Sequence, residues 1–420
     1  MLNILLINPN DMKHPPVIPI GLEYLKTYLM KDGYSVKILD LCFETRPLKK
    51  LQNILQENTY DIAGITIRNI DLSSYYRNKF YLPRIKKIVE IIKNYGIPVI
   101  LGGAGFTAMP EEILSYLRAD YGIVGPGEKA FTDFLDKWKK NKLEKNILNG
   151  WQFIPDYDLI HYRGKDVDYK KYISDGGIVG FETHKGCSGL CPYCIEAKNP
   201  LHFKKIPNII EELKFLITNG FDHFHLCDSE FNDDLAYSIK FCEKLIEARL
   251  KLKWTLYMKP SPYNEHLFRL LHDSNAYLIT LSVDSYEKFH KLNNYSYQDL
   301  ENIINYCKKY NIQLDIDLLC GYPGEPKESI IKMIKFFKET RPNNVGITFY
   351  YRIYNHTQLA NIIKNNFKFQ KRLTRKLQDP EDFLEPIFYS NYDIKFFKKL
   401  IDKDKIFRIS GLKPGVNYQL

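Results

Sequence analysis

The sequence lacks the long apolar runs that membrane proteins need. In its 420 residues no uninterrupted run reaches about 18 apolar residues, the length of a membrane-spanning helix. The first residues, 1–9, have neither a basic segment nor a small-residue cleavage site, so we expect no signal peptide. Hydrophobic residues make up 45% of the chain, which is ordinary for a globular protein and argues against disorder. A chain of this length can bury two domain cores and carry a short extension.

A strong bias toward one charge sign in any segment is also lacking. The formal net charge is +10, because 60 lysine and arginine residues outnumber 50 aspartate and glutamate residues. The lysines alternate with glutamates and isoleucines along the predicted helices, which is typical of a solvated helix face. We therefore expect neither a nucleic-acid partner nor a membrane span.

Cysteines are few, and most stand alone. Five of the eight lie singly in apolar stretches, which predicts core positions rather than disulfides and fits a reducing, cytoplasmic location. No second Cys-x-x-Cys pair is present, although zinc sites favour such pairs. The isolated cysteines are Cys42, Cys227, Cys242, Cys307 and Cys320.

The other three cysteines lie together in one loop. Cys187, Cys191 and Cys194 have the spacing Cys-x-x-x-Cys-x-x-Cys and follow an apolar run, 177–183, that predicts a strand. Three thiolates this close can bind one side of a cubane iron–sulfur cluster and leave one iron open to a chelating ligand. His184 is a poor candidate for completing a tetrahedral zinc site. The alternative, three small buried apolar residues in a loop, is less favoured by this spacing.

This loop resembles the signature of the radical SAM superfamily, in which an aromatic residue, here Tyr193, precedes the third cysteine. The resemblance implies a [4Fe–4S] cluster on the three cysteines. It also implies that the open iron binds the amino and carboxylate groups of S-adenosylmethionine. Reductive cleavage would then yield a 5′-deoxyadenosyl radical, with an external one-electron reductant of the flavodoxin or ferredoxin type as a partner.

The first 145 residues alternate short apolar strands with helices. This alternation predicts a doubly wound, Rossmann-like parallel sheet, whose ligands bind beyond the carboxyl ends of the strands. The predicted strands are 3–7, 36–39, 62–67, 98–101 and 121–124, and the predicted helices are 22–29, 49–56, 84–93, 111–117 and 130–138.

Four of the predicted strand ends are rich in glycine and small polar residues. Glycine lets a backbone approach a bulky ligand closely. The phosphate-binding pattern GxGxxG is absent from the first turn, so we expect no nicotinamide cofactor. The candidate ligand-binding residues are Asn8, Pro9, Arg68, Asn69, Gly102, Gly103, Thr107, Gly125, Gly127 and Glu128.

These glycine-rich strand ends, together with residues 19–25 and 110–112, resemble the cobalamin-binding domain that precedes some radical SAM domains. The resemblance implies that the strand-end residues bind cobalamin. The DxHxxG motif, whose histidine is the lower cobalt ligand in many cobalamin enzymes, is absent, so no cobalt ligand is predicted. The alternative is a Rossmann-like domain that has lost its cofactor.

The second half of the chain predicts a partial barrel. Six apolar strands, each with polar residues at its carboxyl end, fit a (β/α)6 TIM-like arrangement, which the radical SAM superfamily shares. We predict a cobalamin-binding domain at 1–145, a linker at 146–172, a radical SAM barrel at 173–358 and a helical C-terminal cap at 359–420. The six strands are 177–183, 221–227, 254–258, 277–283, 314–320 and 345–350.

The same resemblance assigns residues at the barrel's strand ends to S-adenosylmethionine. Carboxylates after the second strand can accept charge-assisted hydrogen bonds from its amino group. Residues after the fourth strand are candidates for its carboxylate or ribose, and the turn 321–325 for its adenine. The alternative for the acidic residues is helix capping. The candidates are Tyr193, Asp228, Ser229, Glu230, Ser282, Asp284, Gly321 and Pro323.

Aromatic residues after the sixth strand are candidates for the substrate cavity. Tyr351, Arg352 and Tyr354 follow this strand, although aromatic residues more often pack in a core. The resemblance implies a cobalamin-dependent radical SAM enzyme. Its most common reaction is methyl transfer to an unactivated carbon, here of a small-molecule natural product or lipid.

Several alternatives stay open. Similar architectures carry out ring contraction, cyclisation or other rearrangements, the cobalamin domain could be vestigial, and a non-catalytic sensor is a further class. A methylthiotransferase needs three further clustered cysteines in the N-terminal domain, where only Cys42 is available.

Overall fold

The chain divides into two compact units. The computed structural model describes residues 2–13, 15–153, 159–378 and 382–412, so residues 154–158 of the predicted linker lie outside the described part. The first unit contains residues 1–73 and 78–179, and the second contains residues 74–77 and 180–420. Within the described ranges, no helix is both long and apolar enough to cross a membrane.

The first unit is built on a six-stranded parallel sheet with the order β2-β1-β3-β4-β5-β6. The central strands are almost fully buried, as their continuous apolar sequences predict. The strand order reverses between β1 and β3, and such a switch point is where this type of sheet binds ligands. The strands are β1 (Asn3–Asn8), β2 (Ser35–Asp40), β3 (Ile62–Thr66), β4 (Val99–Gly102), β5 (Tyr121–Val124) and β6 (Ile147–Asn149).

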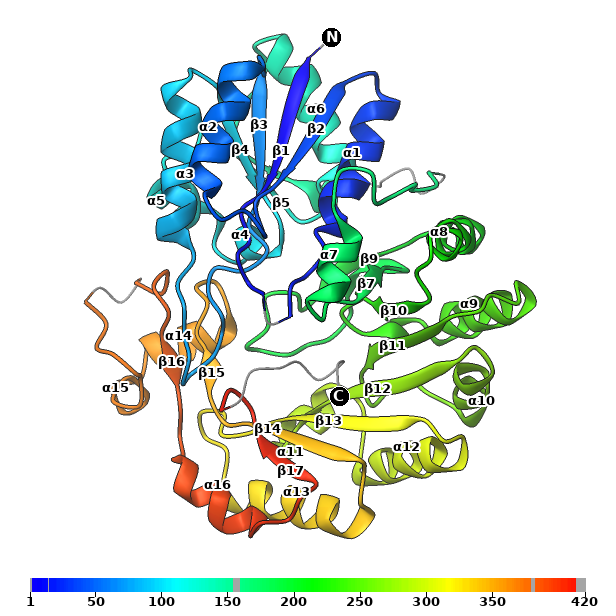
Figure 1. Ribbon diagram of the computed structural model, residues 1–420. Coiled ribbons are helices and arrows are strands. Elements are labelled where there is room, and N and C mark those ends of the chain that lie inside the picture. The colour runs from blue at the N-terminus through cyan, green and yellow to red at the C-terminus, as the bar shows by residue number, and fades with distance from the viewer. Residues whose placement is uncertain (1, 14, 154–158, 379–381, 413–420) are drawn as a thin grey trace. The chain divides into compact units, whose positions relative to one another are not determined.

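Helices cover both faces of this sheet (Figure 1). α1 (Ile20–Lys31) and α6 (Glu128–Lys139) contact each other on one face. On the other face, α3 (Leu82–Asn94) contacts α2 (Pro47–Glu57) and α5 (Pro110–Leu117). Apolar residues at helical spacing are the buried ones, and proline opens α2 and α5 where its missing N–H costs nothing. The predicted doubly wound sheet is confirmed.

The sequence did not predict four short elements of the first unit. β6 pairs with β5 inside the stretch predicted as a linker, and α7 (Tyr169–Ser174) lies in the same stretch. A further short helix, α4 (Ala104–Ala108), and a 3-10 turn, η1 (Gly150–Gln152), also have no sequence signal of their own. These four segments have neither a long apolar run nor a sustained helical period of apolar residues.

The second unit is an open, partial barrel whose seven strands have the order β17-β14-β13-β12-β11-β10-β7. The neighbouring pairs from β10 to β17 are parallel. α9 (Leu235–Glu247), α10 (Glu265–Asp273), α12 (Tyr297–Lys309) and α13 (Lys327–Thr340) connect successive strands, and α8 (Ile206–Thr218) precedes β10 (Figure 1). The strands are β7 (Val179–Phe181), β10 (His223–Leu226), β11 (Lys253–Met258), β12 (Ala276–Asp284), β13 (Gln313–Leu319), β14 (Asn344–Thr348) and β17 (Phe407–Ile409).

The C-terminal segment contributes more than the predicted helical cap. β17 extends the barrel sheet, and Gly346 of β14 stands opposite Arg408 of β17. A Cβ atom at residue 346 would lie 3.2 Å from Arg408 Nε, so the small residue makes room for the arginine. The segment also contains β16 (Phe388–Tyr389), which pairs with β15 (Tyr351–Arg352), and the helices α14 (Gln358–Lys364), α15 (Phe367–Gln370) and α16 (Ile394–Ile401).

Residues 74–77, between β3 and α3, belong to the second unit. The Tyr75 ring stacks on the Tyr350 ring with a centroid distance of 5.4 Å and also lies near Phe349 and Phe388. Such ring pairs bury large apolar areas, so this short segment is held by an aromatic cluster of the second unit.

Candidate functional site

The cysteine loop lies in a hairpin that the sequence did not predict. β8 (His184–Cys187) pairs with antiparallel β9 (Asn199–Phe203), and the three cysteines lie at the end of β8 and in the connection that follows. Gly186 has a φ of 94°, and a Cβ atom there would lie 2.0 Å from the Pro200 carbonyl oxygen. Only glycine allows this approach of the two strands.

The three cysteine sulfurs each have an N–H group directed at them. The Gly189 amide donates to Cys187 Sγ at 3.3 Å, and the Glu196 amide donates to Cys194 Sγ at 3.4 Å. The side chain of Asn293 donates to Cys191 Sγ, with an N–S distance of 3.9 Å. Hydrogen bonds to sulfur are among the features by which proteins stabilise and tune iron–sulfur clusters. These three N–H donors therefore fit an iron–sulfur cluster bound to the three cysteines.

The Cys187 and Cys191 sulfurs both lie near Gly189. A Cβ atom at Gly189 would lie 3.2 Å from Cys187 Sγ and 4.0 Å from Cys191 Sγ. Burial, together with the carboxylate of Asp233 near Cys187 and that of Asp284 near Cys191, raises the pKa of each thiol to about 12. A group of neutral thiols beside carboxylates is electrostatically suited to exchange its protons for cationic iron.

A buried set of charges holds the start of this loop. Asp233 accepts hydrogen bonds from the Ser188 amide at 3.3 Å and from Ser188 Oγ at 2.5 Å. Lys259 Nζ donates to Ser188 Oγ at 2.7 Å and also pairs with Asp233. His184 Nε2 lies 3.7 Å from the same carboxylate. Neither Asp233 nor Lys259 was singled out from the sequence, because only the fold brings them to Ser188.

The carboxylate of Asp228, a predicted ligand of S-adenosylmethionine, is occupied by contacts with other residues of the chain. Its carboxylate accepts from the Thr183 amide at 2.7 Å and from the Thr183 hydroxyl, and lies 3.0 Å from His184 Nδ1. These contacts join the end of β10 to the start of β8. Its neighbour Ser229 donates to Glu196 Oε2 at 3.1 Å.

Glu230, in contrast, has a shielded atom with no partner. Its Oε2 is inaccessible to solvent and has no hydrogen-bond partner among the described residues. Burial raises the pKa of Glu230 to about 8, although a hydrogen bond with Ser282 opposes this shift. A shielded carboxyl group without a partner is costly unless a ligand supplies one. Its place after β10 fits the amino group of S-adenosylmethionine.

Aromatic side chains line the strand ends beside the cluster loop. Tyr193 Oη donates to Asp284 Oδ1 at 2.9 Å, at the end of β12. The Tyr193 ring lies 5.2 Å from the Tyr351 ring, which lies 5.5 Å from the Tyr322 ring. Tyr322 is in the turn that contains Gly321 and Pro323, and Glu325 Oε2 in this turn accepts the Gly321 amide at 2.5 Å. The structure thus brings these predicted residues together.

Of the other two predicted substrate residues, Arg352 holds the C-terminal segment and Tyr354 packs against Arg352. The Arg352 guanidinium donates to the main-chain carbonyls of Phe383 and Leu384 at 2.9 and 3.1 Å. It also lies over the Tyr354 ring, 4.8 Å from its centroid. Only Tyr351 of this group takes part in the aromatic wall beside the cysteine loop.

In the first unit, the ends of β1 and β2 are filled by the chain's own side chains. Asn8 Nδ2 donates to Asp40 Oδ1 at 2.9 Å, and Tyr172 Oη donates to Asp40 Oδ2 at 2.8 Å. Asn8 is 2% exposed and Tyr172 is fully buried. Tyr172 lies in α7, in the stretch predicted as a linker, so its role had no signal in the sequence.

The glycines at the other strand ends are of two kinds. Gly103 and Gly125 have positive φ values of 96° and 75°, and Cβ atoms there would lie 2.7 Å from the Ile67 carbonyl and 2.4 Å from the Trp151 ring. Packing therefore explains these two. At Gly102 the nearest atom would be 4.0 Å away, and at Gly127 none lies within 4 Å. Open space at these two positions fits a close approach by a large ligand.

Polar residues gather at the switch point between β1 and β3. A small pocket there is lined by residues from both strand ends and from the start of α3, and Asp11 at its rim pairs with Arg84 and Lys79. Thr107 joins the next two strand ends, because its Oγ1 accepts the Gly125 amide at 2.9 Å. The pocket residues are Pro9, Asn10, Asp11, Met12, Thr66, Arg68, Asn69, Tyr81, Arg84 and Ile85.

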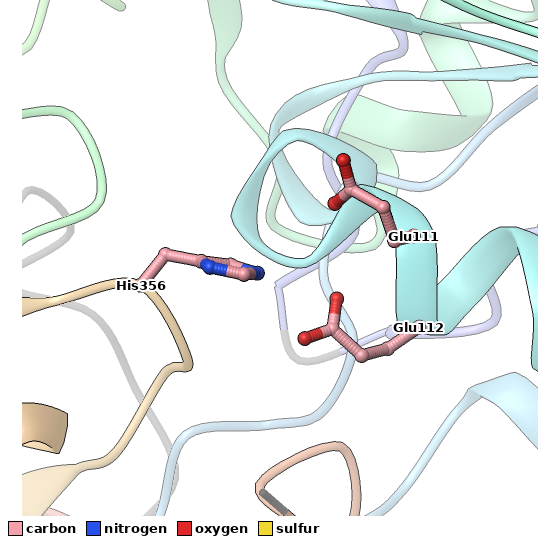
Figure 2. A group of neighbouring side chains, drawn as sticks. All are labelled: Glu111, Glu112 and His356. Atoms are coloured by element: carbon pink, nitrogen blue, oxygen red, sulfur yellow. The ribbon is translucent and has the colours of Figure 1, made fainter.

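Two acidic residues open α5. Glu111 and Glu112 both project from its first turn (Figure 2), where carboxylates interact favourably with the positive end of the helix dipole. His356, also labelled in Figure 2, belongs to the second unit and has a positive φ of 65°. Helix stabilisation accounts for the two glutamates.

Family comparisons match both units. The B12 binding domain family matches residues 14–135, and the radical SAM superfamily matches residues 181–337. The chain is a radical SAM protein with a B12-binding domain. The two matches together span about two thirds of the sequence. The predicted family is confirmed.

Several known proteins resemble this radical SAM protein over most of its length. Tryptophan 2-C-methyltransferase of Streptomyces laurentii is 22% identical, with 85% of this chain and 74% of the relative covered. An uncharacterised methyltransferase of Pyrococcus horikoshii is 24% identical over 76% of this chain and 73% of its own.

A solved structure also resembles this radical SAM protein over its whole length. The radical S-adenosylmethionine methyltransferase TsrM of Kitasatospora setae, solved with tryptophan and a SAM analogue, has a TM-score of 0.88 and 20% identity. The match covers 100% of this chain and 94% of that one. At this identity the likeness establishes the fold, and it confirms the predicted order of a Rossmann-like sheet followed by a partial barrel.

Proposed function

We propose that this protein is a cobalamin-dependent radical SAM methyltransferase that transfers a methyl group to a carbon atom of a small molecule. The observation that carries the proposal is the cysteine loop, in which three sulfurs spaced for a cluster each receive an N–H hydrogen bond. The B12-binding domain ahead of this barrel distinguishes the proposal from radical SAM chemistry without cobalamin. Both relatives are named as methyltransferases, which favours methyl transfer over rearrangement.

The second unit supplies the groups that would hold two of the cofactors. Cys187, Cys191 and Cys194 would bind the cluster and leave one iron open. Glu230 would accept the amino group of S-adenosylmethionine on its shielded oxygen. The turn 321–325, fixed by Glu325, would place main-chain atoms against the adenine.

The first unit supplies the cobalamin site. Gly102 and Gly127 have open space in front of them, and Arg68 and Asn69 line the pocket at the switch point. No histidine is among the predicted strand-end residues, so we assign no residue to the cobalt. When bound, cobalamin would supply a methyl carrier, and the cluster with S-adenosylmethionine would supply the methyl group and the 5′-deoxyadenosyl radical that takes the hydrogen atom from the substrate carbon.

The remaining residues would orient the reactants and exclude water. The rings of Tyr193, Tyr322 and Tyr351 lie against one another, and Tyr322 and Tyr351 are only 5% and 3% exposed. Water exclusion protects reactive species from side reactions. A natural-product or lipid intermediate is the proposed substrate class, and a flavodoxin- or ferredoxin-type protein is the proposed electron donor.

The test is transfer of a labelled methyl group. Anaerobically reconstituted protein is incubated with methyl-labelled S-adenosylmethionine, a low-potential reductant and a small-molecule panel that begins with tryptophan, the substrate in the relative's name. We expect label on a carbon of one panel member, and only when cobalamin is present. Transfer that continues without cobalamin would contradict the proposal.

A further inference from the structure

Asn293 makes three hydrogen bonds that tie the cysteine loop to a distant helix. It directly follows α11 (Glu287–Leu292), which lies after β12. Its Oδ1 accepts the Leu190 amide at 3.2 Å, while its Nδ2 donates to Cys191 Sγ at 3.9 Å and to the Phe289 carbonyl at 3.3 Å. The main-chain N–H of Leu190 can only donate, which fixes the orientation of the Asn293 amide and leaves its two N–H groups for the sulfur and the carbonyl.

The bond to Cys191 differs from those to the other two sulfurs. Cys187 and Cys194 accept main-chain amides from two residues further along the loop. Cys191 accepts a side chain that is 102 residues away in sequence. Any residue type except proline supplies a main-chain amide, whereas this donor depends on the identity of residue 293.

Asn293 also completes the anchoring of the loop. Asp233 and Lys259 hold Ser188 on one side of Gly189. Asn293 holds Leu190 and Cys191 on the other side. A loop fixed at both ends keeps its sulfurs in place before iron arrives, which lowers the ordering cost of cluster binding.

We infer that Asn293 is a positioning residue for the cluster, which holds Cys191 in place and raises the cluster's reduction potential through its N–H···S hydrogen bond. This inference rests on the proposed iron–sulfur site. Reduction adds negative charge to the cluster and its sulfurs, and an N–H donor stabilises that charge. Loss of the donor should therefore make the cluster harder to reduce.

Two substitutions separate the contacts. N293L removes the acceptor and both donors with a side chain of similar size and no charge. N293D keeps an oxygen that can accept the Leu190 amide, but it has no N–H for Cys191. The matched control is N219D, because Asn219 follows α8 and donates to the Phe215 carbonyl at 2.7 Å in the same helix-end geometry, with no hydrogen bond to sulfur found for it among the described residues.

Three measurements on the reconstituted full-length proteins give the test. Iron analysis reports cluster retention, a redox titration followed by electron paramagnetic resonance reports the potential, and hydrogen exchange on the iron-free protein reports protection of the Leu190 amide. We expect N293L to lower the equilibrium constant for reduction about tenfold, a shift of about 59 mV for one electron, and N293D to lower it further because its carboxylate adds negative charge beside Cys191. We expect faster exchange at Leu190 in N293L alone, and parent values in N219D.

The outcomes distinguish this inference from the proposed function. A parent protein that retains no cluster contradicts the proposed function itself. Parent-like potentials in both Asn293 variants, with Leu190 exchange unchanged in N293L, overturn the inference and leave the proposed function intact. An N293L protein that melts like the parent but retains no iron supports the positioning role, and N293D then reports the potential.

Discussion

His184 and Asp228 form a fully buried ion pair, with Nδ1 and Oδ2 3.0 Å apart and both side chains 0% exposed. The imidazole also lies 3.7 Å from Asp233, the residue that holds Ser188 in the cysteine loop. Burial by itself lowers the pKa of His184, but the two carboxylates outweigh it and raise the pKa to about 10. The fold thus places a histidine with a raised pKa beside the carboxylate that holds the cysteine loop.

The first prediction concerns H184Q. The folded-state pKa of His184 lies above its unfolded value of 6.5, so its stabilisation is complete below pH 6.5 and is lost as the pH rises toward about 10. Removing one partner of a buried pair costs about 3–5 kcal/mol. Urea unfolding of the iron-free proteins should show that the difference in free energy of unfolding between the parent and H184Q decreases across this pH range. A pH-independent difference would falsify the ion pair's proposed charge state.

The second prediction concerns Glu182, whose Oε1 lies 3.0 Å from both Lys185 Nζ and Lys204 Nζ. Burial raises the pKa of Glu182, but the two lysines outweigh it and lower the pKa to about 2. Its contribution to stability is therefore present above pH 4.5 and is lost as the pH falls toward 2. Circular dichroism during acid titration should show E182Q losing less stability than the parent over this range. Equal losses in the two proteins would contradict the assignment.

The third prediction concerns Glu230. E230Q should weaken binding of S-adenosylmethionine by about 10- to 100-fold, since a hydrogen bond to a charged group contributes about 1.5–3 kcal/mol. The empty carboxyl group must lose its proton to accept the ammonium, so affinity should rise with pH up to about 8. Equilibrium dialysis on reconstituted protein measures both effects. S229A is the control, because Ser229 donates to Glu196, and an E230Q protein with parent affinity would contradict the assignment.

The fourth prediction compares two neighbouring glycines. G103A should destabilise the protein by about 1–3 kcal/mol, because residue 103 has a φ of 96° and its Cβ atom would lie 2.7 Å from a carbonyl oxygen. G102A meets no atom closer than 4.0 Å, so it should melt like the parent and bind cobalamin more weakly. Thermal melts and cobalamin dialysis separate the two. Unchanged cobalamin binding in G102A would remove Gly102 from the site.

The features that could be predicted from the sequence are motifs within one short stretch and strands with long apolar runs. The cysteine spacing lies within eight residues, and the longer buried strands have clear apolar runs. β6 and β17 have three residues each, and they form strands because a neighbouring strand edge accepts them. No residue pattern inside either segment indicates this.

The hydrogen-bond partners of the site residues could not be predicted from the sequence for a related reason. Asn293 contacts a cysteine 102 residues away, and Tyr172 contacts an aspartate 132 residues away. The sequence also identified Asp228 and Arg352 as polar residues near strand ends, but the hydrogen bonds that occupy them come from the folded chain. Spacing thus predicts ligand sets made by one loop, while contacts between distant segments require the structure.

The most direct test of the central claim is a count of metals on one sample. Anaerobic reconstitution with iron, sulfide and hydroxocobalamin should give about four irons and one cobalt per chain. A variant with Cys187, Cys191 and Cys194 changed to alanine should lose the iron and retain the cobalt. Four irons without cobalt would contradict a cobalamin enzyme, and iron retained by the triple variant would contradict the assigned cluster site.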